Sequence, residues 1–432
     1  MKRILPAFLY FAGSLFAQNS ADVNSEIAEL RMLVQKLQTR LDQLEARTQP
    51  APPPPAAISS TADPLAGTTV NVLLDGYYSY NFNAPIGRAN LLRAYDVSSN
   101  AFSLNQAAVV IENAADPAHG KRWGARLDLQ FGQATATLQG NPTNEPRPSI
   151  YRNVFQAYGT YVVPAGSGLT VDFGKWASSL GYENNYTKDQ INYSRSYWFN
   201  FLPFYHMGAR AAYKPKDWLT VNYWLVNGAQ QTEAFKPYKD QLVGITAQNK
   251  ALSWTLNYYR GQEHADFQYV TSSNASLPAQ QGMPFVPIRP APDGRLHIVD
   301  SYLGWQATPK LLLAFEGDYV IQRLFKNSTP ERVTGGAAYA RWQVLPRLAI
   351  GGRAEYMSDR GGMFSGVTQA LKETTLTLEH KLADGFTVKE EWRRDFSNRA
   401  YFLTDRLGIL SRQQNTATVG LVWWFGAKQG AW

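Results

Sequence analysis

The chain has 432 residues, of which 44% are apolar and 13% aromatic, with a mean hydropathy of −0.33 and no cysteine. The composition excludes disulfides and thiolate metal sites. Beyond the N-terminus no stretch holds the roughly 18 apolar residues that a membrane helix needs, which excludes helical membrane proteins. The net charge of +8 is scattered without a Lys/Arg-rich run, so we expect no nucleic-acid partner.

Residues 1–17 have the pattern of a secretory signal peptide. Lys2 and Arg3 precede the apolar stretch 4–16, and Ala17 stands before polar residues. The alternative, a short buried helix, fits less well with a polar boundary this close to the N-terminus. We therefore expect an exported protein.

Residues 22–47 carry a heptad repeat. Its apolar positions are Val23, Ile27, Leu30, Val34, Leu37, Leu41 and Leu44. Such a stripe lines one side of a helix, and a helix this short needs a partner surface to be stable. We predict a self-associating coiled-coil stalk, because the following residues 48–68 form a Pro-rich linker rather than a folded domain. The alternative is a helix that packs on its own domain.

From Val70 onward the period changes from 3.5 to 2, which is typical of strands with one apolar and one polar face. In 123–131, for example, Trp123, Leu127 and Phe131 alternate with Arg126 and Asp128. Sixteen such segments are predicted, at 69–82, 102–112, 122–132, 153–163, 168–176, 205–214, 218–228, 240–248, 251–261, 295–306, 310–321, 332–343, 347–358, 371–381, 386–396 and 416–425.

The connections between these segments alternate between tight turns and long loops. This layout and the even strand number predict an all-β fold, a 16-stranded antiparallel transmembrane β-barrel over 69–432, surrounded by outer-membrane lipids. A soluble β-sandwich or propeller also alternates, but it would bury inward charged pairs such as Arg126 and Asp128 in a dry core.

One segment departs from the pattern. In 386–396, Glu390 and Arg394 fall on the predicted lipid face, where a charge at mid-membrane costs up to a few kcal/mol. Either a β-bulge or a subunit interface over this patch would remove the conflict.

Several motifs resemble the OmpL-like family of bacterial outer-membrane β-barrel porins. They are DGYYSYNFNAP and NAFSLNQAAVVIE within 75–113, VDFGKWASSLGYE at 171–183, NYSRSYWF at 192–199, HMGARAAY at 206–213 and GGRAEYMSD at 351–359. The resemblance covers most of 70–425 and implies a pore-forming barrel, with no substrate attached. The stalk is an addition that is similar to trimeric porins with a periplasmic coiled coil, and residues 426–432 extend past the expected terminal aromatic, Phe425.

A pore obtains its selectivity from charges in the lumen and from its constriction. The residues predicted to line the lumen are Arg126, Asp128, Asp172, Arg210, Asp300, Glu316, Asp318, Arg353, Glu355, Glu391, Arg393 and Asp395. They include no ladder of basic residues, which a dedicated phosphate pore would need.

The connection 177–204 is predicted to fold into the pore and set its size. The residues chosen there are Tyr182, Glu183, Tyr186, Lys188, Asp189, Tyr193, Arg195 and Tyr197. Its aromatic rings could form a sugar-stacking path, or, as we favour, pack the loop or belong to the aromatic belts at the membrane interfaces.

The sequence therefore predicts an outer-membrane porin, a passive diffusion channel for small hydrophilic solutes, assembled as a homotrimer with its stalk in the periplasm. No cofactor, metal or catalytic residue is expected, since the five histidines have no catalytic spacing and no G-x-S-x-G occurs. The alternatives are a lipase-like barrel enzyme and a structural anchor whose stalk binds a partner. An anchor needs only about eight strands, whereas sixteen enclose an aqueous channel.

Overall fold

The computed structural model describes residues 20–48, 65–139, 145, 147–269, 288–428 and 431–432. The predicted signal peptide 1–17 and linker residues 49–64 lie outside these ranges. The chain divides into two units, Met1–Ala66 and Gly67–Trp432.

The first unit contains one helix, α1, at Ser20–Thr48, which covers the predicted stalk 22–47. The heptad positions from Ile27 to Leu41 are all exposed on this single helix. Among the described residues, no helix combines the length and the apolar character needed to cross a membrane. Self-association of the stalk stays a prediction.

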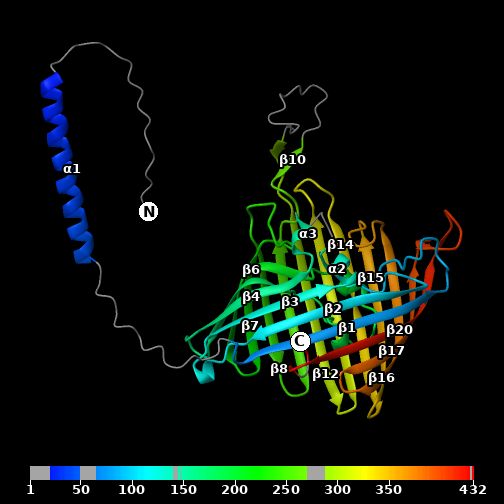
Figure 1. The fold of residues 1–432 in the computed structure, drawn as a ribbon. Coiled ribbons are helices and arrows are strands. Elements are labelled where there is room, and N and C mark those ends of the chain that lie inside the picture. The colour runs from blue at the N-terminus through cyan, green and yellow to red at the C-terminus, as the bar shows by residue number, and fades with distance from the viewer. Residues whose placement is uncertain (1–19, 49–64, 140–144, 146, 270–287, 429–430) are drawn as a thin grey trace, which may run out of the picture. The chain divides into compact units, whose positions relative to one another are not determined.

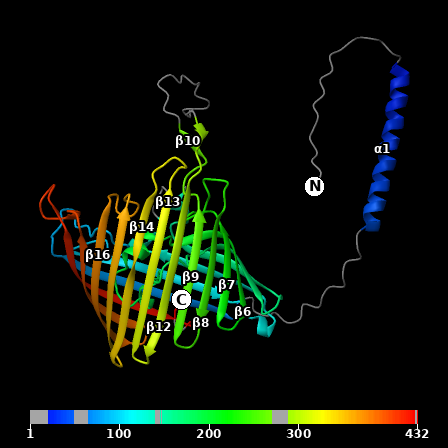
Figure 2. The same ribbon diagram turned by 180° about the vertical axis from the view of Figure 1, so that it is seen from behind.

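The second unit is a closed antiparallel barrel of sixteen strands (Figures 1 and 2). The strands are β1 Thr68–Asn81, β2 Ala101–Asn113, β3 Trp123–Phe131, β4 Val154–Val163, β5 Leu169–Ala177, β6 Tyr205–Lys216, β7 Leu219–Val226, β8 Asp240–Gln248, β9 Leu252–Gly261, β12 Arg295–Thr308, β13 Leu311–Arg323, β14 Glu331–Leu345, β15 Leu348–Arg360, β16 Gln369–Ala383, β17 Phe386–Ser397 and β20 Gln413–Gly426. The predicted fold class and all sixteen predicted segments are confirmed.

The barrel closes because β1 pairs with both β2 and β20, so no strand edge is left unpaired. Short turns join the strands at one end and long loops at the other, as predicted (Figure 1). The loops contain the short helices α2 Gln133–Gln139, α3 Pro148–Tyr151 and α4 Tyr197–Phe201, the 3₁₀ turns η1 Pro117–His119 and η2 Thr187–Asp189, and the two-stranded sheets β10 Phe267–Tyr269 with β11 Ile288–Pro290 and β18 Phe402–Leu403 with β19 Leu410–Ser411.

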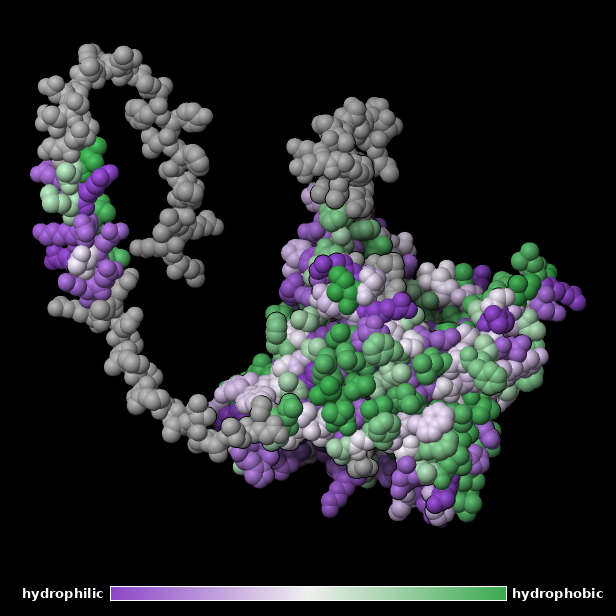
Figure 3. All heavy atoms as spheres, in the orientation of Figure 1, coloured by the Kyte–Doolittle hydropathy of each residue, from purple (hydrophilic) through white to green (hydrophobic). Residues whose placement is uncertain are grey.

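The two faces of the wall differ in chemistry, as the period of two requires. Outward positions such as Phe102, Phe173 and Trp342 are exposed and apolar, and Figure 3 shows hydrophobic residues gathered over the middle of one side of the barrel. Inward positions such as Asp75 and Arg353 are polar and buried by other parts of the chain. An apolar exterior around a polar interior is the arrangement that lipid demands of a β-barrel.

On the outer wall, β16 and β17 carry the polar residues that conflict with the pattern. Glu390 and Arg394 are both exposed. In the stretch around them, β17 pairs with β16 and β20 without any register shift, so the bulge considered above is absent. We call the exposed outward residues Lys372, Thr374, His380, Glu390 and Arg394 the outer polar patch.

Candidate functional site

The connection between β5 and β6, residues 178–204, crosses the inside of the barrel, and we call it loop 3. Its Asn185 side chain donates a hydrogen bond to Gln130 of β3 (2.7 Å), and its Tyr182 N–H donates to Glu316 of β13 (3.1 Å). β3 and β13 are the third and eleventh of the sixteen strands around the ring, so they lie on opposite sides. Loop 3 therefore spans the lumen from wall to wall.

Carboxylates of the inner wall hold the backbone of loop 3. At the start of the loop, Gly181 N–H donates to Asp300 (3.1 Å) and Tyr182 N–H donates to Glu316 (3.1 Å). Further along, Glu391 accepts from Tyr193 N–H (2.6 Å) and Ser194 N–H (3.0 Å). Glu355 accepts from Tyr197 N–H (2.8 Å). A loop buried inside a barrel lacks a strand partner for these donors, and an unpaired buried N–H is costly. Several of the predicted lumen acids therefore serve as acceptors for the loop.

The aromatic rings of loop 3 pack against the wall. Tyr186, Tyr193 and Tyr197 are buried, and the Tyr193 hydroxyl donates to Asp75 of β1 (2.7 Å) while the Tyr197 hydroxyl donates to Asp395 of β17 (2.8 Å). Trp198 is also buried, whereas Tyr182 keeps part of its ring accessible. The rings lie on the lumen side, so loop packing, and not an interfacial belt, describes them.

Two glycines of the wall allow loop 3 to pack closely against it. A side chain at Gly420 of β20 would collide with the Tyr193 ring at 2.2 Å, and one at Gly351 of β15 would meet Ile191 at 2.9 Å. The wall is therefore shaped to the loop at two points that sequence analysis did not select.

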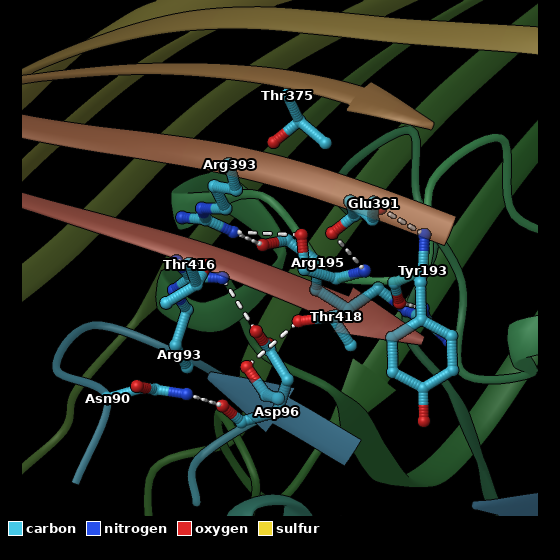
Figure 4. A network of polar contacts seen from close by, with 12 residues as sticks. Asn90, Arg93, Asp96, Tyr193, Arg195, Thr375, Glu391, Arg393, Thr416 and Thr418 are labelled. Carbon is cyan, nitrogen blue, oxygen red and sulfur yellow. Dashed lines mark hydrogen bonds and ion pairs between the residues drawn. The ribbon is translucent and has the colours of Figure 1, made fainter. Parts of the chain in front are cut away.

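A group of buried ions fastens loop 3 to β15, β16 and β17. Arg353 contacts Glu183 of loop 3 (2.7 Å) and Glu373 of β16 (3.0 Å), and Arg393 contacts Asp395 (2.8 Å). We call this group the arginine cluster; its members are Arg93, Asp96, Glu183, Arg353, Glu355, Glu373, Arg393 and Asp395. Figure 4 shows part of it.

The first long loop, residues 82–100, also enters the lumen, which the sequence did not predict. Its Arg93 contacts Asp96 (2.6 Å) and Asp395 of β17 (2.7 Å). Figure 4 shows Arg93 and Asp96 near Thr416. Tyr95 lies under the Arg195 guanidinium of loop 3, with 4.8 Å between that group and the ring centre. The apolar signal for a buried loop is weak here, because the described loop buries polar residues such as Arg93 and Asp96 beside the apolar Ala94 and Tyr95.

The other predicted lumen residues lie on the inner wall in pairs. Arg126 contacts Asp128 (2.8 Å) and Arg210 contacts Asp172 (2.6 Å). Arg210 also lies over Trp176 and Trp224. Asp300, Glu316 and Asp318 are the exception and are considered below.

Loop residues Lys188 and Asp189 contact each other and the C-terminal segment. Their side chains form an ion pair of 2.7 Å, and the Lys188 ammonium lies 4.5 Å from the centre of the Trp432 ring. The Trp432 N–H donates to Asp189 (3.2 Å). Trp432 therefore lies against loop 3.

Cavities lie near both ends of the lumen. One of about 450 Å³ is lined by Phe204, Glu263, Ile298 and Phe364, at the ends of the strands that carry the long loops. Another of about 430 Å³ is lined by Glu112, Arg126 and Thr160, near the turns. Between them stands the wall-to-wall loop, so a solute must pass beside loop 3.

One serine–histidine contact bears on the enzyme alternative. His206 Nδ1 faces the Gly228 carbonyl (3.1 Å) and must carry the proton, so Nε2 accepts from the Ser178 hydroxyl (3.1 Å). The histidine is fully buried, and its orienting partner is a carbonyl instead of the carboxylate that a catalytic triad uses. The contact fits a structural bond at the start of loop 3.

The family comparison agrees with this geometry. Residues 67–425 match the family described as "Putative beta-barrel porin-2, OmpL-like". The chain belongs to this family and is an outer-membrane porin. Among curated protein sequences, no relative matches it.

Solved structures with a similar fold are also outer-membrane barrels. The anion-selective porin from Comamonas acidovorans has a TM-score of 0.54 at 8% identity, covering 83% of this chain and 99% of its own. The outer membrane channel DcaP of Acinetobacter baumannii has a TM-score of 0.51 at 9% identity, covering 83% and 97%. A loop-deletion mutant of OmpT, an outer membrane protein of Vibrio cholerae, has a TM-score of 0.51 at 11% identity, covering 83% and 100%. At these identities the likeness concerns the fold alone.

Proposed function

We propose that this porin is a passive channel for small hydrophilic solutes and that loop 3 sets its bore. The observation that carries the proposal is the pair of anchors on opposite strands, Gln130 on β3 and Glu316 on β13, because a segment bound to both must narrow the lumen. The polar inner wall and the cavities near each end supply the rest of a water-filled path.

Planar-bilayer recording of the purified full chain tests this function. We expect discrete conductance steps that are stable in time and depend linearly on voltage at low potentials. A protein that inserts and gives no steps would contradict the proposal and favour a structural anchor. Reversal potentials in a salt gradient would then measure selectivity.

The charge pattern argues against copying the anion preference of the Comamonas porin. Anion preference needs lumen cations that are free to attract a solute, whereas the guanidinium groups of Arg93, Arg353 and Arg393 face carboxylates. We therefore propose a weakly selective channel without catalytic activity, with the stalk on the periplasmic side.

We further propose that the chain forms a trimer and that the outer polar patch lies in the subunit interface. A lipid-exposed arginine costs about 2–4 kcal/mol at mid-membrane and less toward the interfaces. Arg394 lies between the middle of β17 and its loop end and faces outward, with its guanidinium bonded to Gln413 (2.7 Å). A neighbouring subunit over this face, together with association of the stalk heptads, removes that cost.

Crosslinking tests the interface cleanly because the natural chain has no cysteine. Arg394→Cys in the full chain, labelled with a benzophenone maleimide, should give photo-crosslinked subunits, because the probe reacts with whatever part of the neighbouring subunit lies over the patch. Arg260→Cys is the matched control, since Arg260 also faces outward but lies at the end of β9, on another part of the ring. Equal crosslinking of the two variants, or none in either, would contradict the proposed interface.

A further inference from the structure

Three carboxylates meet on the inner wall next to the start of loop 3. Asp300 of β12 lies directly opposite Asp318 of β13 in the strand register, and Glu316 precedes Asp318 by two residues on the same face. One oxygen of each carboxylate lies within 4.8 Å of the others, and all three side chains are buried. We call these residues the acidic triad.

Two members of the triad are held in place by donors from outside it. Asp300 accepts from Gly181 N–H (3.1 Å) and from the Asn257 amide (2.8 Å). Glu316 accepts from Tyr182 N–H (3.1 Å) and from the Tyr339 hydroxyl (3.0 Å). Each carboxylate oxygen has two acceptor sites, so these bonds orient the groups and leave lone pairs free.

The third member provides a separate observation. Asp318 is only 6% exposed, and neither of its side-chain oxygens accepts a hydrogen bond from an N–H or O–H group of another described residue. Its polar neighbour is the Asp300 carboxylate, and two carboxylates can bond to each other only through a shared proton or a shared cation. Buried polar atoms are almost always paired, so a carboxylate without a donor points to a ligand that completes it.

The charge balance points the same way. Within the described part of the chain, none of the three carboxylates has a Lys, Arg or His nitrogen within 4 Å. By contrast, the carboxylates of Glu183, Glu355 and Glu373 all lie within 4 Å of Arg353. Burying like charges without a cation is strongly unfavourable. A bound cation would remove the repulsion and satisfy Asp318 at once.

We propose that the acidic triad binds a divalent cation with a preference for oxygen ligands, Ca²⁺ in particular. Carboxylates are the only side-chain ligands in the triad, which favours Ca²⁺ over softer transition metals, and carboxylates that bind through one or both oxygens suit the flexible coordination of Ca²⁺. The expectation of no metal rested on the lack of cysteine and of a recognisable histidine motif. Such a motif cannot be seen when two strands contribute the ligands.

The cation would link the wall to loop 3. Asp300 and Glu316 bind the backbone of Gly181 and Tyr182, the first part of loop 3 to leave the wall. Fixing the two carboxylates would therefore fix the entry point of the loop. The proposed site is independent of whether the channel is weakly selective.

Terbium luminescence on the purified full-length protein tests the site. Tb³⁺ replaces Ca²⁺ at oxygen sites, and Tyr182, Tyr302 and Tyr339 lie close enough to one another and to Glu316 to transfer excitation energy. We expect saturable emission at one ion per chain that Ca²⁺ competes away. Asp318→Asn should weaken the affinity more than about tenfold.

Asp172→Asn is the matched control. Asp172 is an inner-wall aspartate with the same 6% exposure, but it is paired with Arg210 (2.6 Å). This variant should bind Tb³⁺ like the natural protein. Glu316→Gln provides a second variant of the triad if Asp318→Asn does not fold, as judged by heat-modifiable migration on gels.

Three results would overturn the proposal. The first is the absence of saturable emission. The second is equal emission in the Asp318→Asn, Glu316→Gln and Asp172→Asn proteins, which would show binding elsewhere. The third is an infrared carboxylic-acid band in Ca²⁺-saturated protein that disappears in Asp318→Asn, because a proton would then hold the triad together in place of the metal.

Discussion

The arginine cluster and the acidic triad lie on neighbouring parts of one inner wall, yet they treat charge in opposite ways. In the arginine cluster, buried carboxylates face guanidinium groups, as in the contact of Arg353 with Glu183 (2.7 Å). In the acidic triad, three carboxylates meet with no such partner among the described residues. In the first region every carboxylate faces a cation of the chain itself, whereas in the second we propose that the cation comes from solution.

Both regions bind loop 3, and the comparison shows two ways to hold a loop inside a barrel. The cluster uses side-chain ion pairs from Arg353 to Glu183, supported by the Glu355 carboxylate on the Tyr197 N–H. The triad uses carboxylates that accept from the backbone of Gly181 and Tyr182. Removal of a charge should therefore lower the free energy of unfolding in the arginine cluster and raise it in the metal-free acidic triad.

The largest effect is expected at the centre of the arginine cluster. Arg353→Met leaves Glu183 buried without its cation and leaves Glu373 with Arg393 alone (3.6 Å), and removing one partner of a buried pair costs about 3–5 kcal/mol. The midpoint of thermal unfolding should fall clearly. Arg341→Met is the control, because Arg341 pairs with Glu379 (2.6 Å) at a more accessible position, where a pair contributes about 0–1 kcal/mol. Similar decreases of the unfolding midpoint in both variants would contradict the claim that the buried arginine cluster contributes more to stability than the accessible pair.

The same substitution should have opposite effects in the two regions. Asp395→Asn removes the charge that faces Arg93 and Arg393, and a hydrogen bond to a charged group contributes about 1.5–3 kcal/mol, so stability should fall. Asp318→Asn in a chelator removes a repelling charge, so stability should rise. Added Ca²⁺ should reverse the order by stabilising only the natural triad. Thermal unfolding with and without Ca²⁺ measures both, and equal signs would contradict the comparison.

A smaller effect is expected at Glu263, in the loop after β9, where a second carboxylate, Asp240, lies close by. Lys236 contacts Asp240 (2.8 Å), and the Tyr259 hydroxyl lies within hydrogen-bond distance of both Asp240 (2.7 Å) and Glu263 (2.8 Å). Desolvation raises the pKa of Glu263 to about 8, and the charge of Asp240 adds to the shift.

The folded protein therefore holds this proton more tightly than the unfolded chain does. The contribution of Glu263 to the free energy of unfolding is therefore greatest below the ordinary glutamate pKa and is lost as pH rises toward about 8. Hydrogen exchange of the Ala229 amide, which contacts Glu263, should accelerate across this window beyond its intrinsic pH dependence. Glu263→Gln should remove the additional acceleration; its persistence would assign the titration to another group.

The barrel could be predicted from the sequence because lipid and water impose a period of two on every strand. Segments such as 123–131 and 416–425 show that alternation without any knowledge of their partners. Strand ends differ from the prediction by about two residues, for example at β16, where pairing with β15 and β17 continues to Gln369 at one end and to Ala383 at the other.

The inside of the barrel was predictable only in part. Charged inward residues such as Arg353 follow from the alternation, and loop 3 was selected for its aromatic rings. The contact of Arg93 with Asp395 joins positions about three hundred residues apart, and no local pattern reports such a meeting. Gly420 is an ordinary small residue in the sequence, and only the Tyr193 ring beside it shows why a side chain does not fit.

The central claim is that a loop fastened across the lumen sets the bore. Single-channel conductance of the full chain and of a variant that lacks residues 184–197 tests it directly. A variant that lacks residues 267–290, the connection carrying β10 and β11, is the control because that hairpin projects beyond the barrel end (Figure 1). The account predicts a larger conductance in the first variant and little change in the second. Unchanged conductance after removal of 184–197, in a protein that still folds and inserts, would contradict it.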